Sequence, residues 1–107
     1  MSKNVVYYIA GPMTGTDDMG RERFAAAERK LRRFSGVVVL NPAALPLGMP
    51  EERYMPICLA MVQQADVVIM LDGWENSFGA RLERQYALAC GKFLMFEDAI
   101  RNVEDEA

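Results

Sequence analysis

The stretch from Ala65 to Lys92, with the sequence ADVVIMLDGWENSFGARLERQYALACGK, carries the clearest signals for the fold of this chain. They begin with an uninterrupted apolar run, Val67 to Leu71, that shows no polar alternation. Such a run is typical of a strand that is covered on both faces in a parallel sheet. A polar loop with Trp74 follows, and then a helix whose first turns carry Glu83. Because ligands of open α/β sheets bind outside the carboxyl ends of the strands, we expect a ligand crevice at this loop.

Strands and helices alternate along the rest of the chain. Besides the central strand we expect strands at 5–9, 37–40 and 93–96, helices at 18–34, 54–64 and 80–90, a proline-rich loop at 43–53 and a short frayed helix at 97–107. Alternation of this kind predicts a parallel sheet with helices on both faces. The expected fold class is therefore α/β, a three-layer Rossmann-like or flavodoxin-like fold with a small parallel sheet of roughly four to five strands. We expect a single domain over residues 1–107, since domains of about 100 to 200 residues are the rule.

Local signals predict where helices end and which faces they bury. Asp17 or Asp18 is expected to cap the first helix, and Gly91 to follow the last one. Pro56 fits only the first turn of its helix, because an interior proline removes a backbone hydrogen bond. In the helix over 80–90, the residues expected to face inward are Leu82, Tyr86, Ala89 and Cys90.

Composition argues against several function classes. The net charge is −3, and the chain has neither an apolar run of membrane length nor a signal-peptide pattern. We therefore expect a cytoplasmic protein that has neither nucleic acid nor a membrane as partner. With two cysteines and no histidine, neither a disulfide framework nor a zinc site is expected, and no cofactor is predicted. Any catalysis must use carboxylates, tyrosines or a cysteine, because histidine, the commonest general base, is missing. A small sheet and eight methionines favour a homo-oligomer, although core packing also accounts for methionines.

Two more loops follow the carboxyl ends of predicted strands. The loop from Gly11 to Asp18 has small side chains that let a ligand approach the backbone, but it is neither a GxGxxG nor a Walker loop. The other loop begins at Asn41. Both loops are explained equally well as ordinary turns. Glu83 is either a functional carboxylate that faces the crevice or a solvated helix residue, and Ser77 can cap its helix.

Four segments carry a resemblance to a known family. They are Tyr7-Tyr8-Ile9-Ala10-Gly11-Pro12-Met13, Asn41-Pro42-Ala43, Gln64-Ala65-Asp66, and Gly73-Trp74-Glu75-Asn76-Ser77-Phe78-Gly79-Ala80 with Glu83 and Ala87. In this order they resemble the nucleoside 2-deoxyribosyltransferase-like superfamily, over nearly the whole chain. The last segment is similar to that of a small branch of uncharacterised phage and bacterial proteins.

The resemblance implies catalytic roles. Glu83 matches the family's nucleophile, whose carboxylate attacks the anomeric carbon and forms a covalent glycosyl-enzyme intermediate. Tyr7 matches a tyrosine that orients this glutamate. Ser77 matches a position that is acidic in transferases of free nucleosides and serine in relatives that hydrolyse nucleoside 5′-monophosphates, which points to a nucleotide. The residues expected to contact the substrate are Ala10, Gly11, Pro12, Met13, Asn41, Asp72, Gly73, Trp74, Ser77 and Gly79.

One residue departs from the family pattern. Where family members commonly carry an aspartate near the leaving base or sugar, this chain has Cys58. A thiol is a weaker acid and hydrogen-bonds poorly. Either Asp72 or Glu75 replaces the missing acid, or activity is low or absent. Cys58 itself is either a reactive nucleophile or a cysteine that packs in the core.

These observations lead to one functional hypothesis and two alternatives. The hypothesis is a nucleoside or nucleoside 5′-monophosphate N-glycosidase or deoxyribosyltransferase that acts through a covalent glycosyl-glutamate intermediate. The first alternative is a catalytically silent nucleotide-binding module that lost the acid at Cys58. The second is a protein-interaction domain that uses the face around Trp74, whose ring either stacks on a base or packs against a neighbouring subunit.

Overall fold

A four-stranded parallel sheet forms the centre of the molecule. The computed structural model describes residues 4–14, 16 and 18–104. The strands are β1 (Val5–Ala10), β2 (Val37–Leu40), β3 (Val67–Met70) and β4 (Phe93–Phe96), in the spatial order β2-β1-β3-β4. All neighbouring strands pair in parallel. The predicted α/β class and parallel sheet are confirmed.

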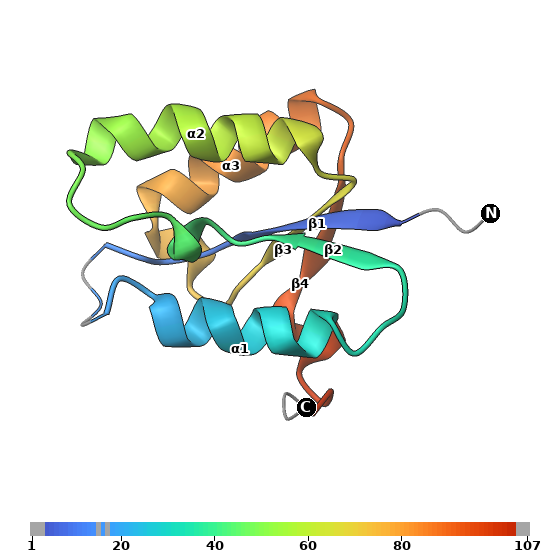
Figure 1. Cartoon of the computed structure of the whole chain (residues 1–107). Coiled ribbons are helices and arrows are strands. Elements are labelled where there is room, and N and C mark those ends of the chain that lie inside the picture. The colour runs from blue at the N-terminus through green and yellow to red at the C-terminus, as the bar shows by residue number, and fades with distance from the viewer. Residues whose placement is uncertain (1–3, 15, 17, 105–107) are drawn as a thin grey trace.

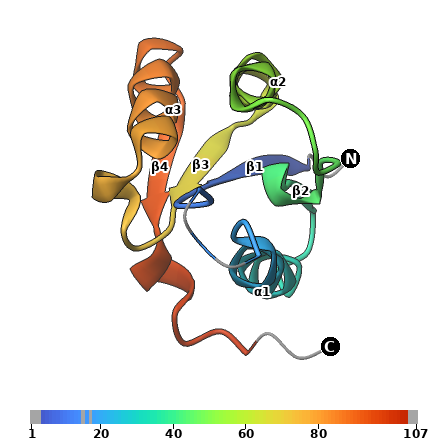
Figure 2. The same cartoon turned by 90° about the vertical axis from the view of Figure 1, so that its left-hand side faces the viewer.

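Helices cover both faces of the sheet. α1 (Arg21–Leu31) lies on one face, and α2 (Glu51–Gln64) and α3 (Phe78–Ala89) lie on the other (Figure 1). Figure 2 shows the resulting three layers from the side on which the strands end. Short 3-10 turns are formed by Pro42–Ala44, Trp74–Asn76 and Glu97–Ile100. Within the ranges described above, no helix is both long enough and apolar enough to cross a membrane.

Two hydrophobic cores explain why the central strand lacks polar alternation. Successive side chains of a strand point to opposite faces of the sheet. On β3, Val68 packs into the core beneath α2 and α3, and Ile69 packs into the core on the α1 side. Both side chains are fully buried, which stabilises the fold by about 1.5 to 3 kcal/mol each. Because both faces are covered, every position of this strand needs an apolar residue.

Residues next to the helices explain where α1 begins and where α3 ends. α1 begins at Arg21 and its N-cap is Gly20 and not the predicted Asp18. Asp18 lies two residues before the N-cap, and its carboxylate accepts hydrogen bonds from the backbone N–H groups of Gly20 and Glu22. The other predicted cap, Asp17, lies outside the described residues. After α3 the chain turns at Gly91, whose φ of 73° is the left-handed conformation expected of the residue that ends a helix.

α2 starts earlier than predicted, at Glu51 rather than Tyr54. Pro56 therefore lies inside the helix, so its prediction as a first-turn residue was wrong. Pro56 is exposed, and water can reach the Glu52 carbonyl that has no helical N–H partner. The earlier start places Glu51 in the first turn of the helix, at the edge of the sheet where the strands end.

α3 buries a different face from the predicted one. Its buried residues are Ala80, Glu83 and Ala87. Of the residues predicted to face inward, Tyr86 is half-buried, whereas Leu82, Ala89 and Cys90 are exposed. The prediction is confirmed for Tyr86, which packs against a core cluster, and is wrong for Leu82, Ala89 and Cys90. The small residues Ala80 and Ala87 let a different face of the helix lie close to the sheet. The buried Glu83 shares this face because it points toward a cleft and not toward bulk water.

Candidate functional site

The candidate site lies where the loops after β1 and β3 diverge. The chain leaves β1 for α1 on one face of the sheet, and leaves β3 for α3 on the other (Figure 2). Such a switch point is where open α/β sheets bind ligands. A cleft of about 100 Å³ occupies this position. It is lined by Gly11, Met13, Thr14, Met19, Phe24, Pro42, Glu51, Tyr54, Met55, Cys58, Ser77, Gly79, Ala80 and Glu83.

The cleft continues into a wider groove between the N-terminal ends of α2 and α3. This outer groove has a volume of about 970 Å³ and includes Pro56, Leu59 and Phe78. The residues that line both parts are Thr14, Glu51, Met55, Ser77 and Gly79. Sites for small molecules usually measure about 300 to 1,000 Å³. The inner cleft is therefore too small for a whole nucleoside, and a ligand of that size would occupy both parts.

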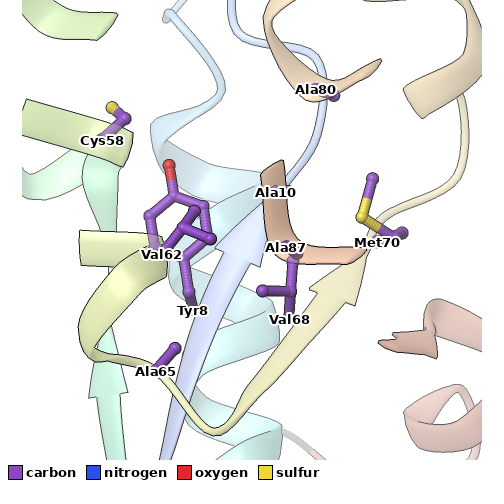
Figure 3. Close-up of a cluster of buried hydrophobic side chains, with 9 residues drawn as sticks. All are labelled: Tyr8, Ala10, Cys58, Val62, Ala65, Val68, Met70, Ala80 and Ala87. Carbon is purple, nitrogen blue, oxygen red and sulfur yellow. The ribbon is translucent and has the colours of Figure 1, made fainter. Parts of the chain in front are cut away.

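Glu83 is the charged residue buried in the inner cleft, with only 7% of its surface exposed. The hydroxyl of Tyr8 on β1 donates a hydrogen bond of 2.7 Å to Glu83 Oε2. Tyr8 is fully buried, and Figure 3 shows its ring directed from β1 toward Cys58 on α2. A rigid strand therefore holds the carboxylate of a helix residue in one orientation, beside the thiol of a second helix.

The tyrosine that holds Glu83 is Tyr8 and not the predicted Tyr7. Tyr7 packs with Ile9 and Phe24 in the core on the α1 side of the sheet. Adjacent residues of a strand point to opposite faces, and α3, which carries Glu83, covers the face opposite α1. The prediction of Tyr7 was therefore wrong by one position, which on a strand means the other side of the sheet.

Burial determines the protonation of the groups around Glu83. Burial raises the pKa of Glu83 to about 7, although hydrogen bonds from Tyr8 and Cys58 act in the opposite direction. Burial also raises the pKa of Tyr8 well above its usual value, and the charge of Glu83 adds to this effect. The pKa of the Cys58 thiol is raised as well, again chiefly by burial. Near neutral pH, Tyr8 and Cys58 are therefore protonated, and Glu83 is shared between acid and carboxylate. A carboxyl group that titrates near neutrality in a cleft is characteristic of functional sites.

The loop after β1 brings its backbone close to β3. A Cβ atom on Gly11 would lie 2.9 Å from the Cβ of Leu71, which is fully buried, so a larger residue does not fit there. Gly11 and Met13 line the inner cleft, and Pro12 lines the outer groove. Ala10 is buried at the end of β1. The structure thus places these predicted substrate residues at the cleft or next to it in the chain.

The first turn of α3 forms another wall of the site. Ser77 caps this helix, because its Oγ accepts a hydrogen bond of 3.2 Å from the Ala80 N–H. Ser77 and Gly79 both line the cleft and the groove. A Cβ atom on Gly79 would lie 3.4 Å from the terminal methyl carbon of Met55 on α2. The absence of a side chain at Gly79 therefore keeps open the passage between the two helices.

Part of the predicted site lies elsewhere, in the loop after β3. Asp72 and Trp74 line neither the cleft nor the groove. Asp72 Oδ2 accepts a hydrogen bond of 2.6 Å from Arg101, and the Trp74 ring lies 5.2 Å from the Arg84 guanidinium carbon. Gly73 between them adopts a φ of 89°. Trp74, which was expected to stack on a base or pack against a neighbouring subunit, and Asp72, a predicted replacement for the missing acid, therefore contact other parts of the chain.

Asn41 is also away from the cleft. Its amide nitrogen donates to Glu28 Oε1 at 2.9 Å, and its amide oxygen accepts from the Ala43 N–H. Both contacts fix the turn after β2 against α1. The sequence left open whether the loop at Asn41 contacts a ligand or is an ordinary turn, and the structure shows Asn41 holding the turn.

Glu51 and Tyr54 line the inner cleft but were not predicted as site residues. The Thr14 hydroxyl donates a hydrogen bond of 3.0 Å to Glu51 Oε1, which connects the loop after β1 to the start of α2. Tyr54 donates to the Pro46 carbonyl at 2.6 Å and accepts from the Met49 N–H, so it holds the proline-rich loop. Glu51 was missed because the loop expected at 43–53 has no periodicity, whereas Tyr54 was expected only as the first residue of the helix at 54–64. An acidic pair directly after Pro50 is, however, a signal for a helix start that would have placed Glu51 at the edge of the sheet.

The described part of the chain contains no group of three or more His, Cys, Asp or Glu side chains that is arranged to hold a metal ion. The site offers a buried carboxylate (Glu83), a tyrosine hydroxyl (Tyr8) and a thiol (Cys58), with the exposed carboxylate of Glu51 at its entrance.

Comparisons with known proteins found a family model and a solved structure that match this chain. Residues 5–96 match the family model described as "Domain of unknown function (DUF4406)". No curated protein matches the chain. Among solved structures, the chain is similar to a "2-desoxiribosyltransferase from Leishmania mexicana", with 27% identity and a TM-score of 0.68. The similar region covers 86% of this chain but 63% of that one, so this chain spans less than two thirds of that protein. The chain belongs to the DUF4406 family, within the nucleoside 2-deoxyribosyltransferase-like superfamily.

Proposed function

We propose that this protein cleaves the N-glycosidic bond of a nucleoside or a nucleoside 5′-monophosphate, as a hydrolase or as a deoxyribosyltransferase. The observation that carries the proposal is the buried Glu83 carboxylate, which Tyr8 holds by a hydrogen bond of 2.7 Å inside a cleft at the switch point of the sheet. Burying a charge is unfavourable, and a fold usually retains such a residue for its chemistry. The similarity to a protein named a 2-desoxiribosyltransferase supports the same reaction class.

The proposed reaction has two displacements. In the first, a Glu83 carboxylate oxygen forms a bond to the anomeric carbon of the sugar, and the bond from that carbon to the base nitrogen breaks. Its electron pair leaves with the base, which takes up a proton. In the second, water or another base attacks the anomeric carbon of the glycosyl ester, loses a proton and releases the Glu83 carboxylate. Tyr8 acts by positioning, because its hydroxyl holds one oxygen of the carboxylate.

Protonation of the leaving base is the step of this reaction that the described side chains of the site support least. Burial keeps the Cys58 thiol protonated and makes it a poorer acid still. Neither Asp72 nor Glu75, the predicted substitutes, lines the cleft or the groove. We therefore propose that water in the open groove supplies this proton, and that turnover is slower than with a carboxylic acid at this position.

The alternative function is a nucleotide-binding module without activity, and Cys58 is the observation that favours it. An incubation of the protein with 2′-deoxynucleosides and their 5′-monophosphates, followed by chromatography for free base, distinguishes the two. We expect base release that is abolished in Glu83→Ala and reduced at least about tenfold in Tyr8→Phe. Tyr7→Phe is the matched control, because it removes a hydroxyl from the same strand on the opposite face. If wild type binds nucleotide in calorimetry but releases no base, the protein is the silent module. Full activity in Glu83→Ala would exclude the mechanism.

A further inference from the structure

The charge of the site distinguishes between the two substrate classes that the proposed function leaves open. Glu83 and Glu51 line the inner cleft, and Glu51 and Glu52 line the outer groove. Among the lining residues in the described ranges there is no lysine or arginine. Sites that bind phosphate usually offer it cationic side chains or helix N-termini. No cationic side chain of the described ranges lines this site, so the attraction of its helix N-termini for a phosphate must be compared with the repulsion by its carboxylates.

The helix N-termini do not balance the negative charge. α2 and α3 both begin at the groove, and each N-terminus is equivalent to about half an elementary charge. Glu51 and Glu52 lie in the first turn of α2, so two full negative charges already face the N-terminus of that helix. Only the half charge of α3 is left to attract an anion. A phosphate monoester carries about 1.5 to 2 negative charges at neutral pH and is therefore repelled.

Glu51 is the carboxylate through which this repulsion acts most directly, because it lines both the cleft and the groove. The Thr14 hydroxyl donates to its Oε1 at 3.0 Å and keeps the carboxylate at the boundary between the two parts. A carboxylate has about four acceptor sites. Those that Thr14 does not use can accept hydrogen bonds from hydroxyl or N–H groups of a ligand that reaches from the cleft into the groove.

We propose that Glu51 is a specificity-determining residue that selects uncharged nucleosides over nucleoside 5′-monophosphates. A nucleoside offers sugar hydroxyls and base N–H groups, all of which can donate to the carboxylate. An ionised phosphate offers acceptors and like charge. The inference rests on the proposed function for the class of ligand, but it concerns binding and not bond cleavage. It also assigns Ser77 to capping α3 and not to holding a phosphate.

The test compares binding of 2′-deoxyadenosine and its 5′-monophosphate by calorimetry, in wild type, Glu51→Gln and Glu22→Gln. Glu51 is exposed, so Glu51→Gln is expected to fold normally, which a thermal melt checks. Glu22→Gln removes the same charge from α1, outside the cleft. We expect wild type and Glu22→Gln to bind the nucleoside at least about tenfold more tightly than the monophosphate. In Glu51→Gln the ratio of the affinity for the nucleoside to the affinity for the monophosphate should fall by about fivefold or more. Added salt should narrow the ratio in wild type and change it less in Glu51→Gln, because salt screens exposed charges.

Tighter binding of the monophosphate to wild type would overturn the inference, and so would a ratio that is the same in Glu51→Gln and wild type. Base release, measured on the same samples, separates this failure from that of the proposed function. Release from both ligands without preference contradicts the role of Glu51 and leaves the glycosidase function standing. Selective nucleoside binding without base release supports the role of Glu51 and contradicts the glycosidase function. Absence of binding by both ligands overturns both.

Discussion

Replacing Glu83 by glutamine should make the protein more stable, by an amount that grows with pH. Burial raises the pKa of Glu83 from an ordinary value of 4.5 to about 7. Each pKa unit corresponds to about 1.36 kcal/mol, so ionised Glu83 destabilises the folded state by roughly 3 kcal/mol relative to the neutral acid. Below the ordinary pKa, the carboxyl group is neutral in both the folded and the unfolded chain, so its burial adds no cost of ionisation to the free energy of unfolding. Between the two values the folded chain binds the extra proton, so its free energy of unfolding falls as pH rises and levels off above about pH 7.

Glutamine remains neutral and can still accept the hydrogen bond from the Tyr8 hydroxyl. We therefore expect Glu83→Gln and wild type to differ little near about pH 4, and the variant to be more stable by roughly 3 kcal/mol near about pH 8. Urea unfolding at a series of pH values measures this difference, provided that both proteins unfold with the same denaturant dependence. Glu75→Gln is the control, since it neutralises an exposed carboxylate and should change stability by less than about 0.5 kcal/mol at each pH. A difference between Glu83→Gln and wild type that does not vary with pH would refute the assignment of a buried, titrating carboxylate.

Three further predictions address the site and its frame. The kcat/KM for base release should rise with pH through about 7, because the attacking group is the Glu83 carboxylate. In Cys58→Asp this rise should move to higher pH, because a second carboxylate opposes ionisation of the first. The pH-rate profiles of both proteins check this, and coincident profiles would contradict it. Gly11→Ala should destabilise the fold by about 1 to 3 kcal/mol, because its Cβ would lie 2.9 Å from that of the buried Leu71; unchanged thermal unfolding would show that the loop can move away. Glu97→Ala should destabilise the folded state by about 1 to 2 kcal/mol, because Glu97 Oε1 accepts hydrogen bonds from the Asp72 N–H at 2.7 Å and from Arg23 at 2.9 Å. Denaturant unfolding of the variant that matches wild type would exclude this role.

The sheet and the position of the site were predictable because they depend on local pattern. The run Val67 to Leu71 is apolar throughout, and that is sufficient to predict a strand covered on both faces. A loop at the end of that strand and a helix with Glu83 follow from the same stretch. Resemblance to a family then distinguished Glu83 from an ordinary surface glutamate, and the structure places it in the inner cleft, buried and hydrogen-bonded.

The partners of Glu83 were less predictable, because they come from other elements. Tyr7 and Tyr8 are adjacent tyrosines in a strand whose faces are both buried, so no alternation shows which one points to α3. Packing decides it, since Tyr8 shares a core with residues of α2 and α3 while Tyr7 shares one with α1. Glu51 was missed because the irregular loop before it shows no periodicity, and its contact with Thr14 joins residues 37 positions apart.

Local sequence patterns predicted the α/β class, the parallel strands and the loop that opens the site, because periodicity and turn residues act over a few neighbouring positions. Glu83 was singled out by the family resemblance and not by its spacing. Contacts between distant parts of the chain place Tyr8 against Glu83, hold Asp72 and Trp74 outside the cleft, and bring Glu51 to it. The pKa of Glu83 also belongs to the tertiary structure. The physical reason is the same in each case: desolvation and side-chain direction depend on what the other layers of the fold place nearby, and no local stretch of the chain contains that information.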